Sequence, residues 1–187
     1  VFDMIPKLLE RTGTNEKGSI TAFYTVLVDG DDMNEPIADK VRGTLDGHII
    51  LDRKLAAAHH YPAIDVLPSI SRCANRVTGK ETKKATAKIR TWLDTYKSRE
   101  TMITTGIYQK GSSPEIDEAI EMHSAIEEFL CQEEFDPCPM NETLDKLSAL
   151  SGIQIPEEEY VENPGVHNPT TAQIVDAMKQ GVNPGEK

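Results

Sequence analysis

The chain has 187 residues, of which 38% are hydrophobic and 27% charged, and its formal net charge is -11. This length and composition predict a globular protein of one domain, or of one domain with an appendage, and exclude a largely disordered chain. The acidic balance disfavours nucleic acid as the main partner, no apolar run reaches transmembrane length, and three cysteines without a CxxC motif predict free thiols in a reducing cytosol.

The chain begins in the middle of a pattern. Its first residue is a valine rather than a methionine, and the apolar residues Phe2, Ile5, Leu8 and Leu9 already follow helical spacing. The stretch VFDMIPKLLER lacks the order of regions found in a signal peptide. We therefore expect the sequence to be a piece cut from a longer protein.

The first 76 residues predict alternating strands and helices. GSITAFYTVLV, residues 18–28, is apolar or hydroxylic on both faces, which is typical of a strand covered on both sides in a parallel sheet. The elements expected after it are a turn at Asp31 and Asp32, a helix over 36–45 closed by Gly47, a strand over 48–51 and a helix over 53–60. This order favours an α/β fold with a parallel sheet.

From residue 77 to residue 152 the pattern predicts helices only. The first helix carries apolar side chains at helical intervals, namely Ala85, Ile89, Trp92, Leu93, Tyr96 and Met102. GSSP predicts the start of the second, with Ser113 as the N-cap and Pro114 at the first helical position. Its apolar stripe comprises Ile116, Ala119, Ile120, His123, Ile126 and Leu130.

A shorter capped helix is expected over 141–150. Beyond Ile155 the sequence becomes rich in Pro, Glu, Asn and Gly, which predicts a tail with one short helix beginning at Thr170 or Thr171 and a disordered end.

Charge is unevenly distributed along the helical half. Residues 76–99 contain eight Lys or Arg against two acidic residues, whereas residues 115–146 contain eleven Asp or Glu against one Lys. Two helical faces that attract each other would explain this pattern, and so would a basic face offered to an acidic partner.

Residue types alone define no self-contained active site. GxxxxGK[ST], GxGxxG and Gly-x-Ser-x-Gly motifs are absent from the sequence. The adjacent His59 and His60 are interpreted as ordinary histidines at a helix end, and Cys131 and Cys138 as incidental. The segment YPAIDVLPSISR is interpreted as a loop that ends in Arg72, and a fixed guanidinium of this kind could stabilise charge on a transferring phosphoryl group.

Three stretches carry a family resemblance: KGSITAFYTVLVDGDDMNEPIAD, LDGHIILDRKLAAAHHYPAIDVLPSISR and YQKGSSPEIDEAI. Together they resemble the C-terminal half of the flagellar protein-export ATPases. That family includes the type III secretion ATPases and is related to the catalytic subunits of rotary F-type and V-type ATPases. The resemblance runs from Val1 to about Gln132.

The resemblance implies an α/β RecA-like P-loop NTPase core followed by a small all-α C-terminal domain. Residues 1–76 would be the C-terminal part of the core, residues 77–155 the helical domain, and residues 156–187 a partly disordered tail. The P-loop, the catalytic glutamate and the ligands of Mg2+ would lie upstream, so the chain alone is expected not to hydrolyse ATP.

The resemblance also implies roles for four residues. Arg72 of SISR matches the arginine finger, which acts in trans on the nucleotide of the neighbouring subunit. Tyr61 of YPAID matches the aromatic residue that stacks on adenine, and Phe129 and Phe135 of FLCQEEF are candidates for the same pocket. Glu133 and Glu134 alter the family spacing before Phe135.

The resemblance implies assembly into a homo-hexamer. The implied partners are central-stalk and regulator proteins of the export apparatus and chaperone–substrate complexes, and the segment GSSPEIDEAI would face the stalk. The implied location is the cytoplasm, peripheral to the inner membrane at the export gate. Two alternatives stay open: a subunit of a rotary F/V-type ATPase, and a non-catalytic interaction module that binds stalk or chaperone proteins through its helical half.

Overall fold

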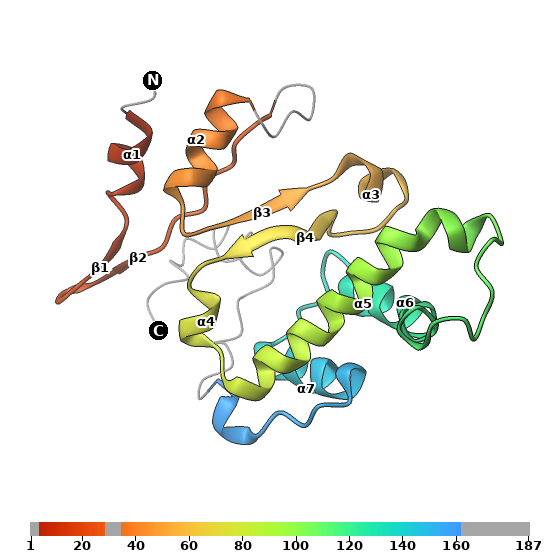
Figure 1. The fold of residues 1–187 in the computed structure, drawn as a ribbon. Helices are drawn as coiled ribbons and strands as arrows, with labels where there is room; N and C mark the ends of the chain where they lie inside the picture. Colours follow the sequence, from red (N-terminus) through yellow and green to blue (C-terminus); the bar gives the residue numbers. More distant parts are fainter. Residues whose placement is uncertain (1–3, 29–34, 162–187) are drawn as a thin grey trace.

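The fold is seen in a computed structural model that describes residues 4–28 and 35–161. Figure 1 shows an N-terminal half of short helices and paired strands, and a C-terminal half in which three helices lie together. In chain order the elements are α1 (Met4–Leu9), β1 (Gly13–Asn15), β2 (Gly18–Ile20), α2 (Pro36–Thr44), β3 (Gly47–Leu51), α3 (Arg53–Ala57), β4 (Ile64–Ser71), α4 (Ala74–Val77), α5 (Lys80–Thr104), α6 (Pro114–Leu130), α7 (Met140–Ser151) and the short 3-10 helix η2 (Glu157–Glu159). Within the described ranges, no helix combines the length and the apolar character needed to span a membrane.

The strands pair differently from the prediction. The described residues form two antiparallel pairs, β1 with β2 and β3 with β4, in place of a parallel sheet. The expected strand over 18–28 is regular only as far as Ile20, and Phe23 and Leu27 beyond it are both 91% exposed. A strand that is apolar on both faces needs cover on both faces, and no described element covers this one. The α/β character of this half is confirmed, but the parallel sheet is not.

Strand β4 also differs from the prediction, because it occupies residues that were interpreted as a loop. Its eight residues run from Ile64 to Ser71, and Arg72 follows directly. The strand contains Pro68, and proline has no N–H to donate to a neighbouring strand. In the structure, the pairing of β3 with β4 is interrupted around Pro68, which is a place where a strand tolerates proline.

The predicted helices of the first half are present but end earlier. Helix α2 covers most of the expected range, and Gly47 begins β3 instead of closing that helix. Helix α3 is capped by Asp52, whose carboxylate accepts a hydrogen bond from the backbone N–H of Lys54 at 2.8 Å. It ends at Ala57, because His59 has a φ of 60° and this left-handed conformation stops a right-handed helix.

The C-terminal half is the helical domain that the apolar periodicity predicted. Helix α5 packs on both α6 and α7, and apolar residues of the three helices form one cluster. Three hydrophobic members of the predicted stripes lie outside it: Met102, Ile116 and Ile120. Ser113 holds the predicted N-cap position of α6, although its side chain makes no capping hydrogen bond. The buried members of the cluster are Ala85, Ile89, Trp92, Ala119, Ile126, Leu144, Leu147 and Ile155.

Helix α7 begins one residue before the predicted start, and Pro139 holds its N-cap position. The Asn141 side chain binds the backbone of Val161, accepting from its N–H at 2.9 Å and donating to its carbonyl at 3.2 Å. The possible helix at Thr170 or Thr171 lies outside the described residues, as does the predicted turn at residues 31–32.

The segment that follows α7 packs back onto the helical half. Ile155 is 5% exposed, and the Glu159 carboxylate reaches the first turn of α5. It accepts hydrogen bonds from the backbone N–H groups of Glu81 and Thr82 at 2.9 and 2.8 Å, and from the Thr82 hydroxyl at 2.7 Å. The Thr82 hydroxyl and these two backbone groups lower the pKa of Glu159. A negative charge here also meets the positive end of the helix dipole.

The basic residues of α5 are directed mainly toward their own fold. Lys97 pairs with Asp65 of β4 at 2.9 Å, and Lys88 donates to the carbonyl of Ser151 at 2.8 Å. Arg90 reaches two carbonyls of β4. In the described part of the chain, none of the ion pairs joins the basic stretch 76–99 to the acidic stretch 115–146. The two charged stretches therefore do not hold each other through salt bridges.

Candidate functional site

Tyr61 lies where the α/β half meets the end of α6. Its side chain is exposed, with 53% of the residue accessible, and it stands just before β4. Its carbonyl accepts a hydrogen bond from the backbone N–H of Gln132 at 2.9 Å. The structure therefore brings Tyr61 next to FLCQ, the segment that the sequence analysis had placed in the same pocket.

The two phenylalanines of that segment have different surroundings. Phe129 is half-buried and packs against the helical cluster, with the rest of its surface accessible. Phe135 lies in the loop after α6 and is 66% exposed. Among the described residues, the one stacked pair of aromatic rings is Tyr96 with His123, at 3.5 Å between ring centroids, and neither phenylalanine stacks on Tyr61.

The residue before Tyr61 is a buried histidine, which the sequence analysis interpreted as an ordinary one. His60 is 8% exposed, and its Nδ1 lies 2.9 Å from Oε2 of Glu127 on α6 and 3.5 Å from Sγ of Cys131. His59, its neighbour in sequence, is exposed. His60 and Glu127 lie 67 positions apart in the chain, so no local pattern could have revealed their contact. Cys131, interpreted as incidental, also contributes to this contact.

Arg72 stands at the other end of β4. Its backbone N–H donates to the carbonyl of Asp46 at 2.7 Å, which fixes the main chain directly after the strand. Its side chain is exposed. Within residues 4–28 and 35–161, the structure gives its guanidinium no hydrogen bond and no ion pair. The donors of this side chain are therefore available to a group outside the described chain.

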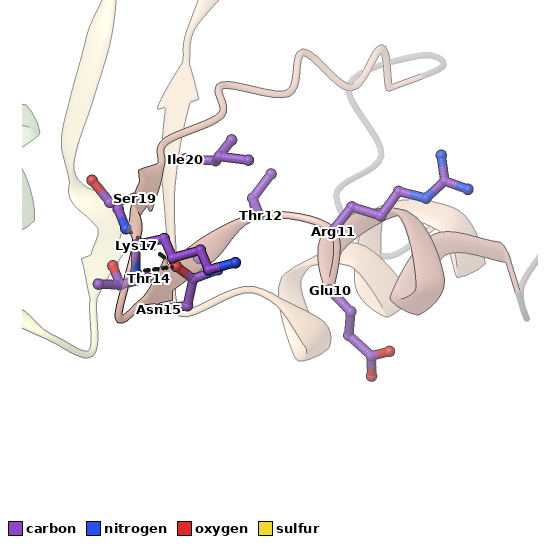
Figure 2. Close-up of a pocket in the computed structure, with 10 residues that line it drawn as sticks. Glu10, Arg11, Thr12, Thr14, Asn15, Lys17, Ser19 and Ile20 are labelled. Carbon is purple, nitrogen blue, oxygen red and sulfur yellow. Dashed lines mark hydrogen bonds between the residues drawn. The ribbon is translucent and has the colours of Figure 1, made fainter.

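Two hollows of the surface lie away from these residues. Figure 2 shows one between the end of α1 and the β1–β2 hairpin, where Asn15 accepts hydrogen bonds from the backbone of Lys17 and Gly18. A second is lined by residues that include Tyr108, Asp117 and Glu121 of the α5–α6 region. Neither contains Tyr61, Arg72 or the two phenylalanines.

The described residues hold no group of three or more His, Cys, Asp or Glu side chains that could bind a metal ion. The exposed Tyr61 ring and the available Arg72 guanidinium are suited to the base and the phosphates of a nucleotide, respectively. The candidate site is thus two separated contacts at the ends of one strand.

Comparison with known proteins defines the class. The model of the nucleotide-binding domain of the ATP synthase alpha/beta family matches residues 1–71, and that of the C-terminal domain of the type III secretion ATPase EscN matches residues 78–149. The fold is thus the C-terminal portion of a RecA-type ATPase core followed by a helical domain.

Relatives place the chain more narrowly. The flagellum-specific ATP synthase of Bacillus subtilis is 53% identical over 152 residues, which cover 81% of this chain and 35% of the relative. The assembled ATPase EscN of enteropathogenic E. coli type III secretion is 43% identical with a TM-score of 0.77, covering 80% of this chain and 36% of that one. EscN in complex with its central stalk EscO is 42% identical with a TM-score of 0.72, and the match covers 80% of this chain and 35% of that one.

The chain belongs to the family of flagellar and type III secretion ATPases. It spans about a third of the length of the relatives that it matches.

Proposed function

We propose that the chain is part of an ATPase that couples ATP hydrolysis to protein export through a flagellar or type III secretion apparatus. The order of the two matched family models and the identity of about half to the flagellar relative support this proposal. The observation that carries it at residue level is Arg72, an exposed guanidinium without a described partner at the end of a strand.

Arg72 is proposed to act as the arginine finger. Such a side chain donates hydrogen bonds to the oxygens of a transferring phosphoryl group, where negative charge gathers in the transition state. Arginine suits the task because it stays protonated and presents a planar fork of donors. A finger that serves another subunit must be exposed and must not be consumed by contacts within its own chain, and both conditions hold for Arg72.

Tyr61 is proposed to stack on adenine, with Phe129 and Phe135 at the same pocket. Tyr61 and Arg72 lie at opposite ends of an eight-residue strand. At roughly 3.3 Å per residue, and allowing for the interruption in its pairing, they are on the order of 20 Å apart. That separation favours two different nucleotides over one, with Tyr61 binding in its own subunit and Arg72 acting on a neighbour.

The chain is proposed to supply contacts and not the complete chemistry. ATP and Mg2+ would be held by the P-loop and acidic residues of the same protein outside this chain, and Mg2+ would neutralise charge on the phosphates. Without those groups we expect the chain alone to be inactive. The proposed assembly is a homo-hexamer at the cytoplasmic face of the export gate, with stalk, regulator and chaperone–substrate partners. The assembled EscN supports the oligomeric assembly, and its complex with EscO supports the stalk partner.

The test is Arg72→Ala in the complete ATPase. We expect kcat to fall by on the order of a thousandfold or more, while the affinity for ATP changes little. Arg76→Ala is the matched control, because Arg76 is an exposed arginine four positions further on. Wild-type turnover by Arg72→Ala would refute the assignment.

Action in trans has its own test. Subunits carrying Arg72→Ala are mixed with subunits in which the P-loop lysine is replaced. Each variant lacks what the other supplies, so mixed rings should regain part of the activity. No recovery in rings shown to contain both subunits would contradict action in trans.

A further inference from the structure

The strand that carries Arg72 is irregular in its middle. β3 and β4 pair at one end through Gly47 with Ser71 and His48 with Ile70, and at the other through Ile50 with Asp65 and Leu51 with Ile64. Between these paired ends, a single residue of β3 faces the four residues 66–69 of β4. β4 therefore bulges over these four residues, which have no partner in the register with β3.

Side chains provide the hydrogen bonds that the ladder does not. The Ser69 hydroxyl donates to the carbonyl of Asp65 at 2.6 Å, and His48 Nε2 donates to that of Pro68 at 3.1 Å. The carbonyls of Val66 and Leu67 both accept from Arg90, at 2.7 Å each, one from each terminal nitrogen of its guanidinium. Four successive carbonyls are thus satisfied, two of them by one arginine.

Arg90 comes from the other half of the molecule. It lies on α5, which packs against β4 (Figure 1). Its neighbours Ile89 and Trp92 are 5% and 8% exposed in the helical cluster, so the helix that presents Arg90 is firmly anchored. Arg90 thus connects the core of the helical domain to the bulge of β4.

We infer that Arg90 is a positioning residue for hydrolysis, through which the helical domain fixes the strand that presents Arg72. The inference rests on the proposed function, since it gives Arg90 a role only if Arg72 acts on a nucleotide. The arginine fork holds two adjacent carbonyls at once, which a lysine with its single charged nitrogen does not reproduce. The bulge is followed by Ile70, Ser71 and then Arg72, so its loosening should displace the guanidinium.

The test compares four variants of the complete ATPase: Arg90→Ala, Arg90→Lys, Arg72→Ala and the double variant Arg72→Ala/Arg90→Ala. Lys88→Ala is the matched control, because it removes a positive charge from the same helix. Lys88 bonds the carbonyl of Ser151 and lies over the Trp92 ring, both inside the helical half. Steady-state hydrolysis gives kcat and KM for ATP, and hydrogen exchange read by mass spectrometry reports on peptides that cover 64–72 and on those of α6 and α7.

We expect Arg90→Ala to lower kcat by about ten- to a hundredfold, the range that a misplacement of about 1 Å produces, with little change in KM. Exchange should rise over 64–72 and stay unchanged in α6 and α7, which shows that the domain is folded. Arg90→Lys should recover only part of the rate. The double variant should be no slower than Arg72→Ala, because positioning an absent side chain has no effect. Lys88→Ala should keep the wild-type kcat.

The outcomes separate the two claims. Wild-type turnover by Arg72→Ala refutes the proposed function and removes the role given to Arg90. An inactive Arg72→Ala together with wild-type kcat for Arg90→Ala leaves the proposed function intact and overturns the inference. Unchanged exchange over 64–72 in Arg90→Ala also overturns it, as does full activity of Arg90→Lys.

Discussion

The contact between His60 and Glu127 should couple the two halves of the molecule, and its strength can be worked out from the structure. One hydrogen bond of 2.9 Å joins the two side chains. The His60 side chain is 8% exposed, whereas that of Glu127 is 39% exposed. A hydrogen bond that involves a charged partner contributes about 1.5–3 kcal/mol when it is shielded from water. Solvent at the carboxylate screens it, so about 1–2 kcal/mol is expected here.

A double-mutant cycle measures this value directly. His60→Ala, Glu127→Ala and the double variant are unfolded in urea, with the single tryptophan, Trp92, as the fluorescent reporter. Each single change should lower the free energy of unfolding, and the double change should cost less than the sum by about 1–2 kcal/mol. Glu128→Ala is the control, since Glu128 is the exposed neighbour of Glu127 on α6.

The same contact should affect nucleotide binding. His60 precedes Tyr61, whose carbonyl is held by the backbone of Gln132. In the complete ATPase, His60→Ala should therefore weaken ATP binding by a few-fold, whereas Arg72→Ala should lower kcat. A coupling energy near zero in the cycle would refute the claim that this pair fastens the α/β half to α6, even if both single variants were destabilised.

Three further predictions concern the helical half. Glu159→Gln should destabilise the chain at neutral pH, because the lowered pKa of the Glu159 carboxylate means that the fold favours its charged form. The contribution of this charge to stability is complete above the usual glutamate pKa and disappears as the pH falls through the lowered value. The free energies of unfolding in urea of wild type and variant should therefore converge in acid. Gly79→Ala should have a similar effect and add little to Glu159→Gln, since a Cβ at Gly79 would lie 2.0 Å from Cδ of Glu159 and displace its carboxylate; full additivity in a cycle would contradict this. Ile126→Ala removes a side chain that is 1% exposed and should cost about 2–5 kcal/mol in the same assay, and a loss below about 1 kcal/mol would show that the cluster collapses into the cavity.

The helical half could be predicted well because its structure is local. A stripe of apolar residues at helical spacing buries one face whichever partner covers it, so Ala85, Ile89 and Trp92 were identified as core before their partners were known. The GSSP turn likewise set the start of α6. The contact of Asn141 shows the limit of local rules, because its side-chain amide binds Val161, 20 residues away.

The strands were predicted less well because their stability depends on partners that the local sequence does not specify. Residues 18–28 have the composition of a buried strand, yet only three of them form one. Conversely, β4 contains a proline and two serines, which indicate a loop when considered alone. Where its pairing with β3 is interrupted, its carbonyls accept hydrogen bonds from the side chains of Ser69, His48 and Arg90, which belong to three elements.

The same limit applies to the candidate site: the sequence gives the type of each residue but not its position in the fold. Nothing local distinguishes Arg72 from an ordinary surface arginine, and its role followed only from the family resemblance. His60, Glu127 and Arg90 were missed because each acts across 23 to 67 positions of the chain. Charge counting did single out the basic stretch around Arg90, but it could not show that Arg90 binds carbonyls of β4 rather than an acidic partner.

The distribution of buried side chains explains why these long-range contacts matter. Among the described residues, nine hydrophobic side chains are buried, and eight of them belong to the cluster of the helical half. The strands contribute none, and Ile49, Leu51 and Ile70 of β3 and β4 are 55–69% exposed. Burial of apolar area is the main favourable term in folding, so β4 gains little from a core of its own. Within this chain, the position of β4 therefore depends in large part on its polar contacts to the helical half. The two proposed nucleotide contacts at its ends would depend on the same contacts.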